Sequence, residues 1–429
     1  MSPKRRAEDL PQNALGLAGL VHLGDSILLF FITTFGFVSA LAALRLPSRA
    51  DRYLSIYHSI VFVLLGRLAS FSKLCREEQM PYCTSTYYAS ATSSTSAPWQ
   101  LIIPFLVALI LPSILKAYLQ PTRSYEGLAP AWIGYVFRTG LFMSALYWVL
   151  DAADNGNWIP NLPDKTLKNI SVYTAQMVLG LALVAGTTAF VWAPPCVSII
   201  TSASPSQPQK AQVAILGYAN AHGARYLLLS LNLLAACLLL SKPMGAGALG
   251  LMAWQVLALL EVLDRNNLTT SPIGPVMLAV LGAFHFFKTG HQAVLSSIQW
   301  DAAFIPLFTI RYPYSPLLVA LNTFAGQILA AAAVPLVVLW KAGPKRRGVL
   351  PAVSRALGAF VAYFAVESLA TMAWAGHLRR HLMLYRVFGP RFMTAAAVLL
   401  VVDVVGIVVA LAGVRVNTMA IGEVFGWAE

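Results

Sequence analysis

Long apolar runs alternate with short polar segments along almost the whole of this 429-residue chain. About 20 apolar residues suffice for one helical membrane crossing, and the chain offers roughly eleven runs of that kind. They are centred near residues 30, 62, 109, 141, 182, 229, 255, 286, 328, 364 and 403. The pattern predicts an all-α fold, a polytopic transmembrane bundle of roughly eleven helices.

The predicted transmembrane domain occupies residues 14–415, between a short basic segment, 1–13, and a C-terminal tail, 416–429. The apolar run Leu15–Leu44 is longer than the about 7–15 apolar residues of a signal peptide, so we interpret it as a retained first helix. Two polar stretches, 72–98 and Thr201–Lys210, are interpreted as loops between helices.

Composition supports a membrane protein independently of the pattern. Hydrophobic residues make up 58% of the chain and charged residues 11%, whereas soluble domains carry roughly 25% charged residues. A soluble globular protein is therefore excluded. The net charge of +13 is typical of proteins that bind phosphates, but the basic residues are scattered between apolar runs. Basic residues in such positions normally meet lipid headgroups, so we expect no nucleic-acid partner.

The orientation of the bundle does not follow from charge, because Lys and Arg divide almost evenly between the two predicted sides. Cys75 and Cys83 share one loop with Pro81 between them, which suits a disulfide in an oxidising compartment; two unpaired thiols are the alternative. A glycosylation sequon at Asn169 falls on the same side, and one at Asn267 falls on the other. We predict that Asn169 and the cysteine loop, 72–98, are lumenal.

The densest polar cluster inside an apolar part of the chain is Phe284–Phe304, FHFFKTGHQAVLSSIQWDAAF. Ionisable groups are costly in hydrocarbon unless they pair or line a cavity, so they indicate a functional site. A helix over Val276–Ser297 would place His285, Lys288 and Gln292 on one face, where the Lys ammonium and imidazoles could hold a phosphate. Alternatively, these groups hydrogen bond to neighbouring helices and only fix packing. The candidate lipid-binding or substrate-binding residues are His285, Lys288, His291, Gln292, Gln299, Trp300 and Asp301.

A second polar cluster, HLRRHLMLYRVFGPRF, begins at His377. We interpret residues 377–391 as an amphipathic helix in the membrane interface, with its basic side chains toward headgroup phosphates. A plain interfacial anchor is the alternative. The two His residues have the i, i+4 spacing of a metal pair, but arginines lie between them and a third ligand is lacking, so we predict no metal site. The candidate binding residues here are His377, Arg379, Arg380, His381 and Arg386.

Single ionisable residues occur in other predicted helices, among them Glu261, Glu367 and Asp403. They could form the ion relay of a transporter, or Glu367 and Asp403 could pair with Arg138, Arg225 or Arg355 across the bundle. They show no recurring spacing, so pairing is favoured. The sequence contains no P-loop, CxxC, GxSxG or HExxH motif, and its 17 acidic residues and seven His are spread along the chain. We therefore assign no catalytic residue.

Several segments resemble, in the same order, the membrane domain of GPI ethanolamine phosphate transferases, especially the type that acts on the third mannose. They are CREEQMPYC at Cys75–Cys83, TGHQ at Thr289–Gln292 with SSIQWDAAF at Ser296–Phe304, NTF at Asn322–Phe324, and LRRHLMLYRVFGPRFM at Leu378–Met393. Members of this family carry a large lumenal, alkaline-phosphatase-like domain ahead of these helices, and this chain begins at Met1 without it.

The resemblance implies a role in GPI-anchor biosynthesis in the endoplasmic reticulum membrane. The chain would bind and position phosphatidylethanolamine and the mannosylated GPI lipid, and the separate lumenal domain would transfer phosphoethanolamine with its own zinc. No cofactor is expected in this chain. A small hydrophobic stabilising subunit is the partner that the family implies. A stand-alone multi-pass transporter, or a non-catalytic membrane helper or scaffold subunit, remains the alternative function.

Overall fold

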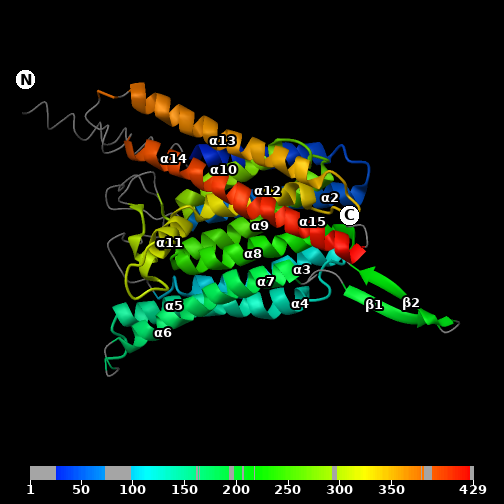
Figure 1. Cartoon of the computed structure of the whole chain (residues 1–429). Helices are drawn as coiled ribbons and strands as arrows, with labels where there is room; N and C mark the ends of the chain where they lie inside the picture. Colours follow the sequence, from blue (N-terminus) through cyan, green and yellow to red (C-terminus); the bar gives the residue numbers. More distant parts are fainter. Residues whose placement is uncertain are drawn as a thin grey trace, which may run out of the picture.

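The structure is a computed structural model of the chain. It describes residues 26–72, 98–160, 163, 165–192, 198–204, 207–216, 218–291, 297–377, 379–380 and 389–425. Within these ranges the chain forms a bundle of helices that run side by side, with one β-hairpin projecting from it (Figure 1). The predicted all-α polytopic fold is confirmed.

Nine helical spans in the described residues are long and apolar enough to cross a membrane. They are Ser26–Ala43, Arg49–Ser72, Ile102–Thr122, Ala129–Asn155, Thr166–Trp192, Ala221–Leu240, Pro243–Arg265, Val349–His377 and Gly389–Phe425. A pair of helices bent by 80° supplies a possible tenth span, and Ile273–Lys288 is a shorter apolar helix. Each of the predicted centres falls within one of these helices or in the bent pair.

Individual elements divide several of these spans. The first five spans contain α2 (Arg49–Ala69), α3 (Ile102–Leu119), α4 (Ala129–Ala131), η4 (Trp132–Phe137), α5 (Arg138–Asn155), α6 (Thr166–Leu179), η5 (Gly180–Ala185) and α7 (Gly186–Trp192). The later elements are α8 (Ala221–Leu240), α9 (Pro243–Arg265), α10 (Ile273–Lys288), η8 (Trp300–Phe304), α11 (Tyr314–Thr323), α12 (Ala325–Leu339), α13 (Val349–His377), α14 (Gly389–Val404), η10 (Val405–Leu411) and α15 (Ala412–Phe425).

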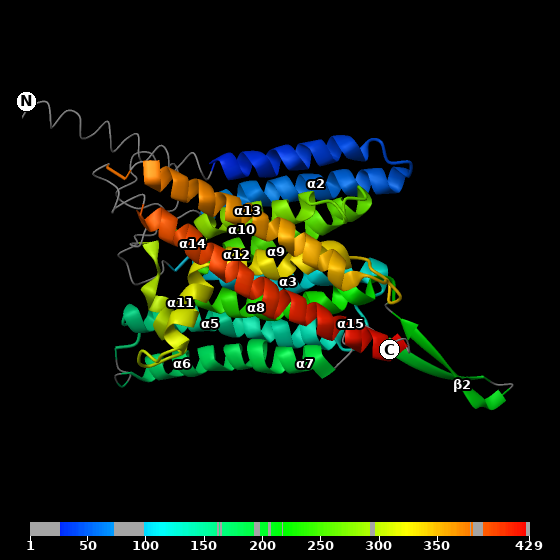
Figure 2. The same ribbon diagram turned by 45° about the horizontal axis from the view of Figure 1, so that its top comes forward.

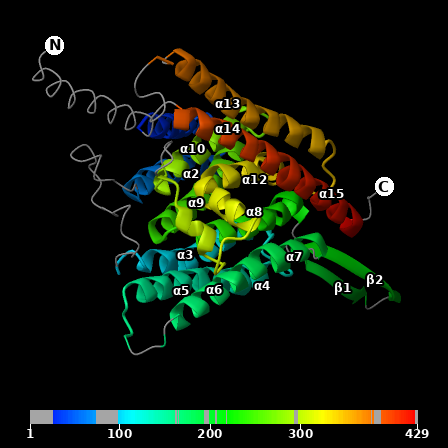
Figure 3. The same ribbon diagram turned by 60° about the vertical axis from the view of Figure 1, so that its left-hand side comes forward.

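Helices α8 and α9 form the centre of the bundle together with α12. In the most apolar parts of α8 and α9, 83% of residues are buried, against 22–44% in the other long spans. Figures 2 and 3 show α13 and the α14–α15 span on one side of these central helices, and α5 to α7 on the other. The outer spans expose large apolar side chains such as Phe30, Leu64 and Leu109. A surface of this kind is soluble in lipid rather than in water.

Helices α10 and α12 approach each other closely through glycine. A Cβ atom added at Gly326 would lie 2.7 Å from the carbonyl oxygen of Gly282 and 3.1 Å from the backbone nitrogen of Phe286. Small residues allow close backbone approach between membrane helices, where dispersion replaces the hydrophobic effect as the packing force. This contact fixes the position of the C-terminal end of α10 against the start of α12.

The helices begin and end at two opposite faces of the bundle. One face, which we call the His291 end, contains the C-terminal ends of α2, α5, α8, α10 and α13 and the irregular segment 297–313. At the other, the Lys341 end, lie the connections 120–128, 266–272 and 340–348. Figure 1 shows the hairpin of β1 (Ser198–Ser204) and β2 (Gln207–Leu216) projecting at this second end. The prediction of a plain loop at Thr201–Lys210 was therefore wrong.

Candidate functional site

The predicted polar cluster begins where α10 stops. The hydroxyl of Thr289 lies 3.2 Å from the carbonyl oxygen of His285 and 3.0 Å from that of Phe286, both in the last turn of the helix. Gly290 follows with φ of 90°, a left-handed conformation that glycine adopts without strain. The helix expected over Val276–Ser297 therefore ends at Lys288. This earlier end is a correction to the sequence prediction.

Four side chains and one backbone carbonyl close a ring of hydrogen bonds at this end. The hydroxyl of Thr289 lies 3.1 Å from His291 Nδ1, and His291 Nε2 lies 3.2 Å from Asn322 Oδ1. Asn322 Nδ2 donates to Gln299 Oε1 at 3.3 Å, and Gln299 Nε2 donates back to the carbonyl oxygen of Thr289 at 3.2 Å. We call Thr289, His291, Gln299 and Asn322 the polar ring.

The polar ring joins three separate segments of the chain, and most of it is buried. His291 and Asn322 are each 1% exposed and Thr289 is 3% exposed. Asn322 Nδ2 also donates to the carbonyl oxygen of Leu240 at 2.8 Å, which ties the ring to the end of α8. Because buried polar groups are costly unless they are bonded, the ring stabilises one arrangement of the turn after α10 and the bend between α11 and α12.

The contacts of Asn322 assign the proton on His291. Since Nδ2 of Asn322 donates to two carbonyl-type oxygens, Oδ1 is the atom that faces the imidazole. His291 Nε2 must therefore carry a hydrogen, and Nδ1 lies 3.1 Å from the Thr289 hydroxyl, whose single proton also faces two carbonyl oxygens of α10. Both ring nitrogens of His291 therefore lie within hydrogen-bonding distance of protein groups.

The two other ionisable candidates of α10 also point into the bundle. His285 is fully buried, with Nε2 2.6 Å from Gln255 Oε1, and Gln255 Nε2 donates to the carbonyl oxygen of Phe62 at 3.0 Å. Lys288 is 1% exposed, and its Nζ lies 4.7 Å from the centroid of the Phe284 ring. His285 and Gln255 therefore link helices α2, α9 and α10 below the surface of the His291 end.

Trp300 and Asp301 are the candidates that reach the surface. They lie in the 3-10 turn η8, where Trp300 is 61% exposed. Asp301 is also exposed, and its Oδ2 lies 3.8 Å from Lys242 Nζ at the start of α9. Gln299, in the polar ring, immediately precedes them. The ring thus supports an exposed aromatic side chain and an exposed carboxylate that faces the half-buried Lys242.

The basic candidates of the second cluster lie at the same end of the bundle. His377 is the last residue of α13, and its ring stacks on Trp374 at 5.7 Å. Arg379 and Arg380 follow and are exposed. Of the segment predicted as one interfacial helix, His377 is therefore the last residue of the spanning helix α13, Arg379 and Arg380 lie in a turn after it, and residues 389–391 begin α14. The remaining candidates, Gln292, His381 and Arg386, and the proposed disulfide pair, Cys75 and Cys83, lie outside the described residues.

Asn169 lies in the first turn of α6, also at the His291 end, and is exposed. Its sequon partner Ser171 is buried and donates a hydrogen bond to the carbonyl oxygen of Lys168 at 2.9 Å. The sequon is therefore part of a spanning helix rather than of a free loop. Glycosylation at Asn169 remains a prediction.

Buried charges away from this end are paired in ways that the sequence did not indicate. Glu261 accepts hydrogen bonds from Lys341 Nζ at 2.8 Å and Trp340 Nε1 at 2.9 Å. Arg225 donates to Asn417 Oδ1 at 3.2 Å and to the carbonyl oxygen of Phe190. Among the described residues, no group of three or more His, Cys, Asp or Glu side chains is arranged to hold a metal ion.

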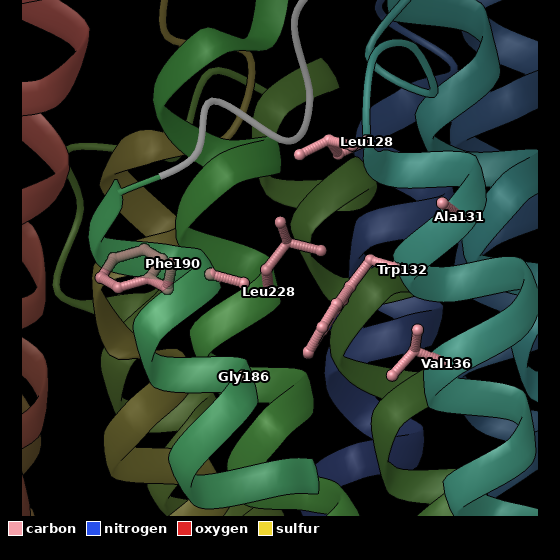
Figure 4. Close-up of a pocket in the computed structure, with 8 residues that line it drawn as sticks. Leu128, Ala131, Trp132, Val136, Gly186, Phe190 and Leu228 are labelled. Atoms are coloured by element: carbon pink, nitrogen blue, oxygen red, sulfur yellow. The ribbon is translucent and has the colours of Figure 1, made fainter.

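A separate apolar pocket of about 90 Å³ lies between η4, α7 and α8. Figure 4 shows Trp132, Val136, Phe190 and Leu228 pointing into it. Its lining side chains are apolar, so the pocket offers no polar group that could orient a headgroup. It is not part of the candidate site at the His291 end.

Sequence reasoning missed two residues that organise the site. Asn322 was named only as part of the NTF segment, and neither Asn322 nor Gln255 was among the predicted binding residues. The available signal was an amide side chain inside an apolar helix, since such groups bond across membrane helices. For Asn322, the sequence NTF also marks the break at Phe324 between α11 and α12.

Comparison with known proteins finds several relatives with one name. The chain is 38% identical over 360 residues to "GPI ethanolamine phosphate transferase 3" of Eremothecium gossypii and 33% identical over 364 residues to the Saccharomyces cerevisiae protein of that name. Both alignments cover 83% of this chain and 35% of the relative. The mouse "GPI ethanolamine phosphate transferase 3, catalytic subunit" is 26% identical, with 88% of this chain and 43% of the relative covered.

No protein-family model and no solved structure matches the chain. The chain spans about a third of the length of the curated yeast relatives it matches. The resemblance stated from short segments is thus supported by similarity over most of the chain. This multi-pass membrane protein is a homologue of the proteins named GPI ethanolamine phosphate transferase 3.

Proposed function

We propose that this chain is the membrane module of a GPI ethanolamine phosphate transferase and that its His291 end faces the lumen of the endoplasmic reticulum. One observation carries the proposal. The segments that resemble the family, Thr289–Gln292, Ser296–Phe304 and Asn322–Phe324, supply all four members of the polar ring. Three separate segments between residues 289 and 324 thus meet at one end of the bundle.

The proposed role is to bind and position two lipids, phosphatidylethanolamine as donor and the mannosylated GPI precursor as acceptor. Trp300 provides an exposed aromatic ring at headgroup level, where amphipathic rings are favoured. The exposed Arg379 and Arg380 provide forks of donors that match phosphate oxygens. The Lys242–Asp301 pair offers both charges to a zwitterionic headgroup.

In this proposal, transfer itself takes place in a lumenal domain that lies outside this chain. Holding both membrane-anchored substrates beside that domain would raise their effective concentration by orders of magnitude. The buried members of the candidate set, His285, Lys288 and His291, then act by holding the surface segment in place. They are positioning residues rather than headgroup ligands. A small hydrophobic stabilising subunit, implied by the family, would bind the lipid-facing surface of the bundle.

The rival function, an ion-coupled transporter, receives less support from the charges. Glu261, which was a candidate for an ion relay, is bonded by Lys341 and Trp340 and lies beside Arg265. A relay residue must exchange its proton or ion, whereas this carboxylate is neutralised within a cluster. A scaffold subunit that binds a separate catalytic chain is compatible with the same geometry, and the experiment below distinguishes it.

A chimaera tests the proposal directly. The region of the Saccharomyces cerevisiae relative that matches this chain is exchanged for the chain, in cells without the native protein. Mass spectrometry of GPI precursors is expected to show phosphoethanolamine on the third mannose. Precursors without that group, in a chimaera of normal abundance, would contradict the proposal. Restoration only when this chain is expressed as a separate polypeptide would assign it to the scaffold role.

A further inference from the structure

A polar pocket lies at the Lys341 end, on the opposite face of the bundle from the polar ring. It has a volume of about 240 Å³ and lies between the connection before α10 and the first turns of α13. Its polar lining consists of Thr269, Thr270, Ser271, Arg346 and Arg355. This volume is below the roughly 300 Å³ of the smallest typical ligand sites, so the pocket suits a compact polar group.

The two arginines of the pocket are held differently. Arg346 is half-buried, and its Nη1 donates to the carbonyl oxygen of Val338 at 2.6 Å, which fixes the guanidinium at the pocket wall. Arg355 is exposed on α13, and within the described part of the chain it forms no hydrogen bond or ion pair. One guanidinium is therefore preorganised, and the other is available to a ligand.

The hydroxyl groups complete a set of donors. Ser271 Oγ accepts a hydrogen bond from the backbone nitrogen of Ile273 at 3.3 Å, so its own proton remains to be donated. Thr269 and Thr270 bring two further hydroxyls to the same wall. Two guanidinium groups and three hydroxyls around one compact space match the oxygens of a phosphate.

The charge at this pocket is uncompensated by its lining. No carboxylate lines the pocket, and Lys345 and Arg347 flank Arg346 in the same connection. The nearby acids Glu261 and Asp264 each lie 2.8 Å from Lys341 Nζ, which partly neutralises them. Helices α10 and α13 begin here, with N-terminal dipoles that favour an anion, whereas α9 and α12 end here with dipoles of the opposite sign, so the arginines rather than the dipoles supply the net positive charge.

We propose that this pocket binds the phosphate group of an anionic phospholipid in the leaflet at the Lys341 end. The small side chains of Ala352 and Ala356 continue the pocket wall along α13 toward the membrane interior, which leaves room for the glycerol of the lipid. Basic clusters at the ends of spanning helices attract anionic headgroups in this way. The proposal is independent of the function proposed for the His291 end.

Thermal unfolding of the purified full chain in a neutral detergent, followed by tryptophan fluorescence, tests the site. The probes are dioctanoyl phosphatidic acid, dioctanoyl phosphatidylcholine and inorganic phosphate. A ligand that binds the folded state raises Tm by mass action, and a shift of about 2–4 °C is expected at saturating phosphatidic acid. The variant Arg355→Gln is expected to lose at least half of this shift. Arg347→Gln, an exposed neighbour outside the pocket, is expected to keep it.

The outcomes separate the sources of the phosphate. A shift with phosphatidic acid and little with inorganic phosphate supports a lipid ligand. An equal shift with inorganic phosphate supports the same phosphate chemistry with a free anion as its source. Arg355→Gln is the principal variant because Arg346→Gln also removes the bond to Val338 and can disturb folding. No shift with any probe, or equal shifts in Arg355→Gln and wild type, would overturn the proposal.

Discussion

His291 Nε2 lies 3.2 Å from Asn322 Oδ1, and this contact joins the turn after α10 to the end of α11. Both side chains are 1% exposed, so the bond is sheltered from water. It is the central link of the polar ring that supports Trp300 and Asp301 at the surface. The proposed function therefore depends on residues that do not themselves reach a substrate.

Replacing Asn322 should destabilise the bundle more than the loss of a surface amide. Asn322→Ala removes the hydrogen bonds of Asn322 to His291, Gln299 and the Leu240 carbonyl, at a cost of about 1–3 kcal/mol. We expect a lower Tm in detergent. Asn155→Ala, which removes an exposed amide bonded to Asp151, is the matched control. Equal Tm values for the two variants would count against a structural ring.

The close contact between α10 and α12 predicts different effects of alanine at two glycines. Gly326→Ala places a Cβ atom 2.7 Å from the Gly282 carbonyl oxygen, so the helices must move apart and the protein should lose stability. Gly358→Ala, in α13, meets no atom within 4 Å and should be neutral or stabilising by roughly 0.5–1 kcal/mol. Thermal unfolding of both variants checks this. A stable Gly326→Ala protein would show that the helices are not so tightly packed.

The ion pair of Glu261 and Lys341 should show energetic coupling. Lys341 Nζ bridges Glu261 and Asp264 at 2.8 Å each, so its removal leaves two carboxylates without this partner. We expect Glu261→Gln and Lys341→Met each to destabilise the protein, and the double variant to lose less than the sum. A coupling of about 0.5–3 kcal/mol is expected from a double-mutant cycle. Additive effects would mean that the pair is not formed.

Charge removal at the surface of the His291 end should reduce transfer without reducing protein abundance. Arg379→Gln with Arg380→Gln removes two exposed guanidinium groups, and a several-fold fall in phosphoethanolamine transfer is expected in the chimaera. Arg49→Gln, exposed at the opposite end, is the matched control. His291→Ala should instead lower abundance, because it opens the buried ring. Normal transfer in the double variant would exclude these arginines as headgroup ligands.

The proposed orientation can be measured with single cysteines. With the four native cysteines replaced by alanine, Asn155→Cys reports on the His291 end and Lys345→Cys on the Lys341 end. In sealed microsomes, an impermeant maleimide is expected to label Lys345→Cys at once. Asn155→Cys is expected to react only after detergent is added. The reverse pattern would place the His291 end in the cytosol and invert the proposal.

The helices were predictable because long apolar runs leave the backbone few other ways to satisfy its polar groups in lipid. The placement of α10, with a predicted centre near residue 286, also followed from the sequence. The end of α10 could not be predicted, because one Thr and one Gly end the helix inside a segment whose pattern is continuous up to Ser297. The correct end, at Lys288, separates His291 from His285 and gives them different partners.

Partners of polar residues could not be predicted, because they depend on which helices touch. Glu261 pairs with Lys341 and Arg225 with Asn417 across long separations, and nothing in the local spacing indicates this. The hairpin near Thr201 was missed because its polar composition also suits a loop. The exposure of individual side chains could not be predicted from the sequence either. Lys288 was a candidate headgroup ligand but is buried, whereas Trp300 is exposed.

Photo-crosslinking of the donor lipid tests the central claim most directly. A phosphatidylethanolamine that carries a photoreactive group on its headgroup is added to the chain in nanodiscs, and the modified peptides are mapped by mass spectrometry. Crosslinks are expected in 297–313 and 377–380, and excess unlabelled phosphatidylethanolamine should compete with them. Crosslinks confined to other surfaces, or crosslinks that unlabelled lipid does not reduce, would contradict a donor-binding site at the His291 end.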